Sequence, residues 1–353
     1  MSSFLVDSDI KEVAERLGDQ TREFAGKTVL LTGGRGFLGR YFTEVFAYLN
    51  EHVLQEPVTV IVLDNLITAG KLGAEAPDRS GIHFVHHDVI VPYEWDGQLD
   101  YVVHAAGIAS PYYYRAYPVE ALEVSTTGTR HMLELATRHQ ARFIFFSSSE
   151  IYGDPDPKHV PTPESYRGNV ACNGPRSCYD ESKRVGETLC YVFHTKFGTF
   201  TNVIRPFNVF GPGMQETDYR VLPNFANRIK AGETLCVYGQ GNQTRTFCYV
   251  TDALVGFMLI MLHGVPGETY NIGAAEPEVS MVDLVHRLEK TLGRKLKTEI
   301  IEHPDSYPAD EPQRRCPQIR KARLQLGYEP RVTLDEGLRR FLSWTDANYT
   351  GKE

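Results

Sequence analysis

The sequence predicts an α/β fold in which a doubly wound parallel sheet is joined to a smaller, interleaved C-terminal α/β lobe. From Lys27 onward, short apolar runs alternate with stretches of helical periodicity, as in a parallel sheet with helices on both faces. A glycine-rich turn follows the first run, and the pattern becomes less regular after residues 211–213. The runs expected to be strands are Thr28–Leu31, Val58–Leu63, Tyr101–Val103, Phe143–Phe146 and Asn202–Ile204.

This pattern divides the chain into three segments. Residues 1–26 are expected to form an N-terminal extension with a short amphipathic helix at Asp7–Leu17. Residues 27–205 would carry the parallel sheet, and residues 206–353 would form mainly the second lobe, interleaved with the first. In that lobe, Ser280-x-x-Asp283 and Thr333-x-x-Glu336 are typical helix starts, because a hydroxyl followed three residues later by a carboxylate caps free backbone amides.

Bulk composition fits a globular enzyme and argues against several other classes. The chain has 353 residues, of which 42% are hydrophobic and 23% charged, as is ordinary for one large or two smaller domains. A net charge of -8, without a basic cluster interleaved with aromatics, argues against nucleic-acid binding. No apolar run approaches the roughly 20 residues of a membrane span, and the charged N-terminus is unlike a signal peptide.

Cysteine spacing points to free thiols. The six cysteines show no CxxC pair and lie in apolar or helical contexts, which argues against a disulfide framework and against a metal site. Reduced thiols are the normal state in the cytoplasm, so we expect a cytoplasmic protein. The cysteines are Cys172, Cys178, Cys190, Cys236, Cys248 and Cys316.

The glycine-rich turn Thr32–Gly39 joins the first expected strand to a helix. Glycines there allow backbone amides to approach a pyrophosphate at the positive end of the helix, which predicts a Rossmann dinucleotide site. Asp64 ends the second strand, where its carboxylate would bind the adenosine ribose and repel a 2′-phosphate, so NAD is favoured over NADP. The residues expected to contact NAD here are Gly33, Gly36, Phe37, Leu38, Gly39, Asp64, Asn65, Asp88, Val89, Ala105 and Ala106.

Three hydroxyl groups and a carboxylate follow the apolar strand at Phe143–Phe146, in the run Ser147–Glu150. In an open parallel sheet, ligands bind beyond the carboxyl ends of the strands, so this polar group is expected beside the nicotinamide. Ser148 would orient a substrate hydroxyl there, and Glu150 would serve as a further acid or base.

Tyr179 and Lys183 are four residues apart on an expected helix that runs to about Phe197. This spacing puts the phenol and the ammonium group on one face, where the cation favours the phenolate. Free tyrosine titrates near ~10, so a base at neutral pH needs a shift of roughly 3 units. We interpret the pair as a proton-transfer device that also contacts NAD, with the nicotinamide cation adding to the shift in pKa.

These motifs resemble the extended short-chain dehydrogenase/reductase family, which includes the nucleotide-sugar epimerases and dehydratases. The likeness runs from about Lys27 to Trp344 and includes the segment Arg205–Pro212 as well as the glycine turn and the Ser148, Tyr179 and Lys183 set. Within the family, three segments are most similar to UDP-glucuronate decarboxylases: Ser149–Gly153, Gly174–Arg184 and Gln243–Phe247.

The resemblance implies a reaction and a set of site residues. NAD would oxidise the sugar at C4, carbon dioxide would leave from the resulting β-keto acid, and return of the hydride would give the pentose. The catalytic residues would be Ser148, Ser149, Glu150, Tyr179, Lys183 and Arg245. The residues that contact the nucleotide sugar would be Ser110, Asn208, Arg220, Tyr238, Arg245 and Arg315.

Three other functions remain open at the level of sequence. A 4,6-dehydratase would use Glu150 to remove the C5 proton, but Ser149 stands where many such enzymes place Asp. A 4-epimerase would not need Glu150, and a non-catalytic NAD-sensing regulator would not need Tyr179 and Lys183. The chain also departs from the family pattern at Ser125 and Gln318, where Asn and Asp are usual.

The resemblance further implies a homodimer. Family members pair through two long helices, which are expected near Val119–Arg138 and Tyr179–Phe197.

Overall fold

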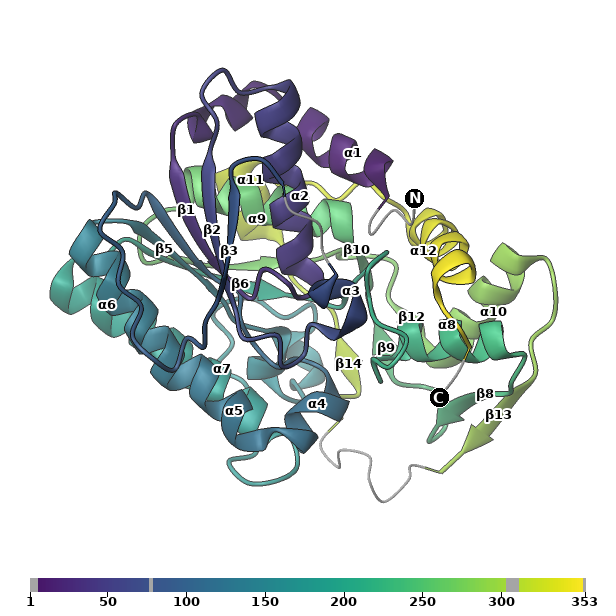
Figure 1. Ribbon diagram of the computed structural model, residues 1–353. Helices are drawn as coiled ribbons and strands as arrows, with labels where there is room; N and C mark the ends of the chain where they lie inside the picture. Colours follow the sequence, from purple (N-terminus) through teal and green to yellow (C-terminus); the bar gives the residue numbers. More distant parts are fainter. Residues whose placement is uncertain (1–5, 76–78, 303–310, 352–353) are drawn as a thin grey trace.

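The structure is a computed structural model that describes residues 6–75, 79–302 and 311–351. Its centre is a seven-stranded sheet in the order β11-β6-β5-β4-β1-β2-β3, and every neighbouring pair is parallel (Figure 1). The predicted doubly wound fold is confirmed: the five expected strands are present, with ends within two residues of those expected, and two further strands, Ile82–His86 and Thr269–Ile272, complete the sheet. The strands are β1 (Thr28–Thr32), β2 (Thr59–Asp64), β3 (Ile82–His86), β4 (Tyr101–His104), β5 (Arg142–Phe146), β6 (Thr201–Pro206) and β11 (Thr269–Ile272).

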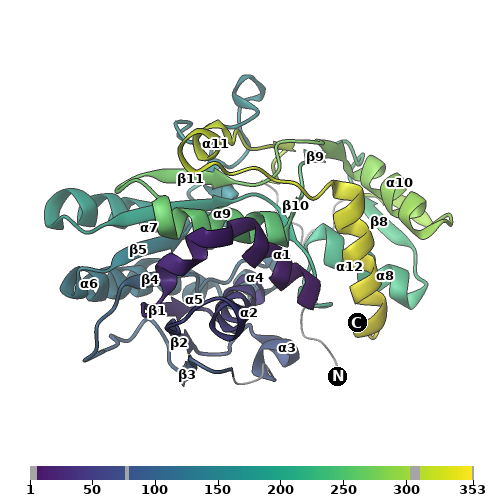
Figure 2. The same ribbon diagram turned by 90° about the horizontal axis from the view of Figure 1, so that it is seen from above.

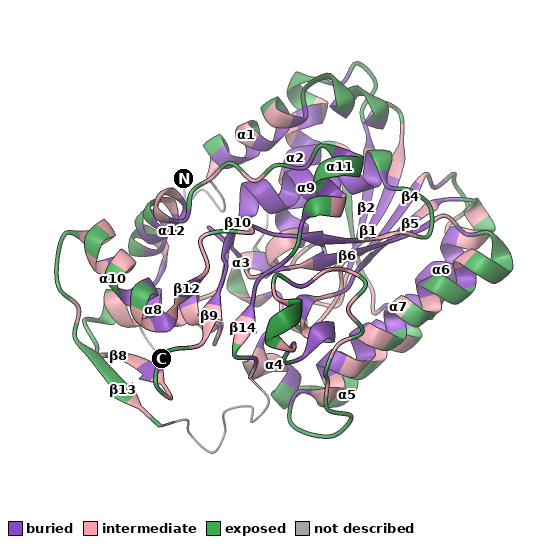
Figure 3. Ribbon diagram, turned by 180° about the vertical axis from the view of Figure 1, so that it is seen from behind, coloured by how far each residue is buried: buried purple, intermediate pink, exposed green. Residues whose placement is uncertain are grey.

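Alternate residues of β1, β2, β4, β5 and β6 enter two separate cores. In β1, Val29 and Leu31 pack in the core that contains α2 (Phe37–His52) and α9 (Val250–His263). Leu30 packs on the opposite face, with α6 (Thr129–His139) and α7 (Ser177–Phe197). Strands buried on both faces need an apolar residue at every position, which explains the continuous apolar runs in the sequence. Figure 2 shows the layers from above, and Figure 3 shows that the central strands of the sheet and α9 are largely buried.

The expected helix near Val119–Arg138 contains a π-helical turn. It consists of α5 (Pro118–Glu123), the π turn Val124–Gly128 and α6. The Val124 carbonyl contacts the His104 ring at 3.1 Å, between Nε2 and O. Ser125, one of the departures from the family pattern, lies within this turn, and its buried hydroxyl finds no hydrogen-bond partner in the described part of the chain.

The second lobe lies beside the carboxyl end of the sheet and is built from short elements. Its small sheets pair β13 (Thr298–Ile301) with β8 (Leu235–Tyr238) and β10 (Cys248–Tyr249) with β7 (Val209–Phe210). In a third sheet, β9 (Thr244–Arg245) lies between β12 (Val279–Ser280) and β14 (Arg314–Arg315). The predicted helix starts are confirmed: Ser280 and Asp283 form a capping box, and the Thr333 hydroxyl accepts a hydrogen bond from the Glu336 amide. Since β11 returns to the main sheet from this half of the sequence, the two parts are interleaved.

The remaining elements complete the chain as follows. The strands are β7 (Val209–Phe210), β8 (Leu235–Tyr238), β9 (Thr244–Arg245), β10 (Cys248–Tyr249), β12 (Val279–Ser280), β13 (Thr298–Ile301) and β14 (Arg314–Arg315). The helices are α1 (Asp7–Leu17), α3 (Gly70–Ala74), α4 (Pro111–Ala116), α8 (Val221–Ala231), α10 (Met281–Leu292), α11 (Arg320–Leu326) and α12 (Leu334–Asn348), with short 3-10 turns at Gly18–Phe24, Ser149–Tyr152 and Pro157–His159. Among the described residues, no helix is both long and apolar enough to cross a membrane.

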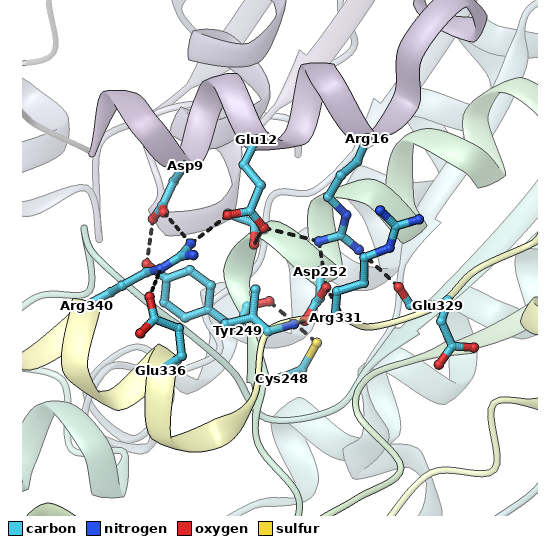
Figure 4. Close-up of polar contacts among 12 residues, drawn as sticks. Asp9, Glu12, Arg16, Cys248, Tyr249, Asp252, Glu329, Arg331, Glu336 and Arg340 are labelled. Atoms are coloured by element: carbon cyan, nitrogen blue, oxygen red, sulfur yellow. Dashed lines mark hydrogen bonds and ion pairs between the residues drawn. The ribbon is translucent and has the colours of Figure 1, made fainter. Parts of the chain in front are cut away.

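The N-terminal helix α1 has the bounds expected from the sequence and is held by buried ion pairs (Figure 4). Arg16 Nη1 lies 2.7 Å from the Asp252 carboxylate, which also accepts hydrogen bonds from two backbone amides. The Tyr249 hydroxyl donates to Asp9 at 2.5 Å. We call this group the α1 cluster; it comprises Asp9, Glu12, Arg16, Tyr249, Asp252 and Arg340.

Candidate active site

The glycine-rich turn leads from β1 into α2 and lines a cavity of about 180 Å³. Gly33 has a φ of +70°, and a Cβ built on it would lie 2.7 Å from backbone atoms of Ala106. A Cβ on Gly39 would lie 2.1 Å from the Gly33 carbonyl oxygen. Only glycine fits at either position, so the backbone forms an open cradle at the start of a helix, which is the geometry that a pyrophosphate requires.

Several polar side chains of this cavity come from the ends of β2 and β3. Asp64 Oδ2 accepts a hydrogen bond from the Arg35 amide at 2.9 Å, and Oδ1 accepts one from the Leu66 amide at 2.8 Å. Asn65 Nδ2 donates to the Asp88 carboxylate at 2.9 Å. Burial raises the pKa of Asp64, while these amide contacts act in the opposite direction. The carboxylate is therefore fixed in orientation where a ribose would lie.

The structure brings the sequence-predicted cofactor residues together. All eleven residues proposed from the glycine turn and the ends of β2, β3 and β4 line this one cavity. The donor set fits NAD, because it offers backbone amides for the phosphates and carboxylates for ribose hydroxyls, with apolar residues between them.

Tyr179 and Lys183 lie on α7 and are both buried. Lys183 Nζ donates to the Phe146 carbonyl at 2.8 Å and lies 5.8 Å from the centre of the Tyr179 ring. Tyr114 stacks on Tyr179, with ring centres 5.6 Å apart and planes 14° apart. The pair thus lies on one helix face, at the carboxyl end of β5, as the spacing predicts.

The side chains of the protein alone do not lower the pKa of Tyr179, which is the effect expected from the sequence. Burial raises the pKa of Tyr179 to about 12, and the charges of Glu150 and Asp180 also raise it. A hydrogen bond with Ser148 and the charge of Arg220 lower it by less. Burial also lowers the pKa of Lys183 to about 8. The expectation that Lys183 and the nicotinamide cation together favour the phenolate therefore stays a prediction, because burial of the phenol acts against it in the protein alone.

A second cavity, of about 630 Å³, lies between α4 and the second lobe, and the helix α8 of that lobe contributes to its lining. Tyr179 and Glu150 line it, and Ala109 and Arg220 line both cavities, so the two adjoin. Of the residues predicted to contact a sugar nucleotide, this cavity is lined by Asn208, Arg220, Tyr238, Arg245 and Arg315. Ser110 does not line it and is a buried residue at the start of α4, where its hydroxyl has no hydrogen-bond partner among the described residues.

Charged side chains that pair with one another line this cavity. Arg315 makes two hydrogen bonds to Glu150, of 2.5 and 2.6 Å, and Arg176 makes a further ion pair with the same carboxylate. The two guanidinium groups outweigh the effect of burial and lower the pKa of Glu150, so this side chain is a carboxylate. Burial, more than the charge of Glu150, raises the pKa of Asp180 to about 7. We call this group the sugar-side cluster; it comprises Glu150, Arg176, Asp180, Arg245, Glu311 and Arg315.

Three members of the sugar-side cluster, Arg176, Asp180 and Glu311, were not assigned a role from the sequence. Arg176 stands three residues before Tyr179, so its position one helical turn away was a usable signal. Glu311 lies 66 residues from its partner Arg245, and no local pattern pointed to it. Arg220 and Arg315, which were predicted to hold phosphate or ribose, are paired with Asp218 and Glu150 in this structure.

The parallel sheet, with the Tyr-x-x-x-Lys helix beside a dinucleotide cavity, defines a short-chain dehydrogenase of the extended type. Known proteins agree with this class. The family model described as the NAD dependent epimerase/dehydratase family matches residues 29–273. The chain therefore belongs to the NAD-dependent epimerase/dehydratase family, and the resemblance seen in its motifs is confirmed.

Among the curated relatives are UDP-glucuronic acid decarboxylases. UDP-glucuronic acid decarboxylase 1 of Xenopus tropicalis is 39% identical over 319 residues, which cover 90% of this chain and 72% of that protein. UDP-glucuronic acid decarboxylase 5 of Arabidopsis thaliana is 39% identical over 311 residues, covering 88% and 86%. The dTDP-glucose 4,6-dehydratase of Streptomyces venezuelae, solved with NAD bound, superposes with a TM-score of 0.77 at 26% identity, covering 91% of this chain and 97% of that one.

Proposed function

We propose that this protein decarboxylates UDP-glucuronate, or a related nucleotide uronate, to the corresponding nucleotide pentose through a 4-keto sugar. The observation that carries the proposal is the sugar-side cluster, whose arginines line a 630 Å³ cavity next to Tyr179. A sugar carboxylate can bind such guanidinium groups in a two-point geometry. The similarity to curated UDP-glucuronic acid decarboxylases supports the same substrate.

The redox step is assigned to the residues on α7 and at the end of β5. NAD, when bound, accepts a hydride from the sugar C4 and later returns it. Tyr179 would take the proton of the C4 hydroxyl, and Ser148 would orient that hydroxyl. Lys183 would hold the ribose and keep positive charge near the phenol. Because burial raises the pKa of Tyr179, the proposal requires the positive charge of the oxidised cofactor as well as that of Lys183.

The decarboxylation step is assigned to the residues around Glu150. A ketone at C4 places the C6 carboxylate β to a carbonyl, so carbon dioxide leaves with its electron pair delocalised as an enolate. Glu150, held as a carboxylate by two arginines, would act around C5 and C6, with Ser149 beside it. Arg245 would bind the carboxylate or donate the proton that returns to C5. Asn208, Arg220 and Tyr238 would contact the nucleotide.

A 4,6-dehydratase is the second candidate, because a dehydratase is among the structures that superpose well on this chain. One assay separates the two functions. The protein is incubated with NAD and either UDP-glucuronate or UDP-glucose, and carbon dioxide and 4-keto-6-deoxy sugar are measured. Carbon dioxide from UDP-glucuronate alone supports the proposal. A 4-keto-6-deoxy product from UDP-glucose would refute it in favour of the dehydratase.

We also propose a homodimer that pairs through α5 and α7. Apolar side chains on these helices are exposed in the single chain: Val119 by 60%, Leu122 by 43%, Val185 by 43% and Tyr191 by 68%. Such a patch is the kind of surface that a partner covers. Light scattering should give twice the chain mass of 39.8 kDa, and Leu122→Lys with Val185→Lys should halve it. An unchanged mass in the double variant would refute this interface.

Two further expectations are also proposals. We propose that residues 27–205 hold NAD and that residues 206–353 provide mainly the sugar side, as the lining of the two cavities supports. We propose the cytoplasm as the compartment, on the spacing of the six cysteines; cell fractionation tests it.

A further inference from the structure

The carboxylate of Glu311 bridges two arginines inside the sugar cavity. Its Oε1 accepts a hydrogen bond from Arg245 Nη2 at 2.6 Å, and its Oε2 accepts one from Arg176 Nη1 at 2.5 Å. All three residues line the cavity, and the Arg176 and Arg245 side chains are each only 7% exposed. One carboxylate thus satisfies two buried guanidinium groups at the place where the sugar is proposed to bind.

The charges around Glu311 leave Arg245 dependent on it. Glu150 already receives three hydrogen bonds from Arg176 and Arg315. Within the described part of the chain, the other acceptors of Arg245 are the carbonyls of Thr244 and Gln313, at 2.8 and 3.3 Å. Without Glu311, the buried guanidinium group of Arg245 would keep only carbonyl acceptors among the described residues, which is unfavourable for a buried cation.

We infer that Glu311 is an internal stand-in for the substrate carboxylate, holding Arg176 and Arg245 in the free protein and giving way to the sugar C6 carboxylate when substrate binds. This inference rests on the proposed function, because it assumes a uronate substrate. The exchange replaces one carboxylate by another, so both arginines stay paired throughout.

The stand-in gives a physical basis for selecting a uronate. A neutral C6 hydroxymethyl group cannot replace Glu311, because its entry would take from Arg245 its carboxylate hydrogen bond and from Arg176 one of its ion pairs, with no anion in exchange. A carboxylate can replace it, at the price of weaker binding, since the incoming group competes with one that is covalently tethered. Glu311 therefore weakens the binding of a uronate but disfavours a neutral sugar more strongly. Its removal should strengthen uronate binding.

The first test asks whether the place of Glu311 accepts a free carboxylate. In Glu311→Ala, sodium acetate should raise the melting temperature by a few degrees as it fills the vacated position, whereas sodium chloride at equal ionic strength should not. The wild type should show no such difference. The matched control is Glu278→Ala: Glu278 and Glu311 are each 22% exposed and paired with arginine, but the Glu278 partner Arg314 is 39% exposed and lies outside the sugar cavity. Equal acetate effects in all three proteins would overturn the inference.

The second test uses Glu311→Gln, which keeps the shape of the side chain and guards against misfolding of the alanine variant. Calorimetry should show the Kd for UDP-glucuronate falling about tenfold, equivalent to about 1.4 kcal/mol. The Kd for UDP, which has no carboxylate, should stay unchanged. Unchanged or weaker UDP-glucuronate binding would show that Glu311 serves only to support the fold.

The two proposals can fail separately. Carbon dioxide release by the wild type, without an acetate effect or tighter binding in the variants, removes the role of Glu311 and leaves the proposed function standing. An acetate effect specific to Glu311→Ala, without carbon dioxide release by the wild type, supports an anion position and refutes decarboxylation.

Discussion

Two groups of buried, oppositely charged side chains lie in different parts of this molecule. The sugar-side cluster and the α1 cluster each combine arginines with carboxylates and a nearby buried tyrosine. The first lines a cavity of about 630 Å³, whereas the residues of the second line neither that cavity nor the cofactor cavity. In the α1 cluster, the Asp252 side chain is 1% exposed and the Asp9 side chain 0%.

The difference shows that buried ion pairs alone do not identify a functional site. In the α1 cluster each charged side chain pairs with one from another element, and these ion pairs hold α1 against α9 and α12 (Figure 4). In the sugar-side cluster the same chemistry faces open space, so its partners can be exchanged for a ligand. Access to a cavity, rather than the residue types, separates binding from structural support.

The largest expected contrast is between two buried tyrosines. Tyr179→Phe should lower kcat about 1,000-fold, because a positioned proton acceptor is lost, and should leave NAD binding and the melting temperature nearly unchanged. Tyr249→Phe removes a hydroxyl that donates to Asp9, so it should reduce stability by about 1–3 kcal/mol and leave kcat unchanged. Steady-state kinetics and urea unfolding test both. Turnover retained in Tyr179→Phe would remove this residue from the mechanism.

A second contrast concerns stability alone. Asp252→Ala leaves Arg16 and two backbone amides without their buried acceptor, so the free energy of unfolding should fall by about 3 kcal/mol or more. Arg339→Ala, at a side chain that is 64% exposed, should change it by less than about 0.5 kcal/mol. Urea titration measures both. If the two variants are equally stable, the α1 cluster does not act as a clamp.

A smaller effect should appear in the pH dependence of stability. Burial raises the pKa of Asp9 from 3.8 to about 6. Protonation of Asp9 therefore stabilises the folded state. This contribution to the free energy of unfolding is fully present below pH ~3.8 and is lost as the pH rises through ~6. The wild type should therefore gain about 2 kcal/mol relative to Asp9→Asn between pH 7 and 4.5.

The contribution of Glu311 to the free energy of unfolding should depend on pH in the opposite direction. Although burial raises the pKa of Glu311, Arg245 and Arg176 lower it from 4.5 to about 2 overall. Its contribution is therefore present above pH ~4.5 and lost only as the pH falls through ~2. The stability difference between the wild type and Glu311→Gln should stay flat between pH 7 and 5. A slope of the same sign for both variants would contradict the contrast between the two clusters.

Much of the fold and part of the site could be predicted because their signals are local. The five strands expected from the sequence each contain a run of apolar residues, whereas β3 and β11 do not; α1 and α7 show helical spacing within a few turns. The glycine turn carries its own geometric requirement, since a Cβ at Gly33 or Gly39 would collide with nearby backbone. Hence the NAD-binding family could be identified from the sequence.

The sequence by itself determined the order of strands and helices, the glycine cradle and the one-turn spacing of Tyr179 and Lys183, because each depends on neighbouring residues. Only the tertiary structure decided which charges meet. Glu311 reaches Arg245 across 66 positions, and Arg16 reaches Asp252 across 236. Burial is likewise a property of the folded molecule, which is why the raised pKa of Tyr179 could not be derived from its four-residue spacing to Lys183.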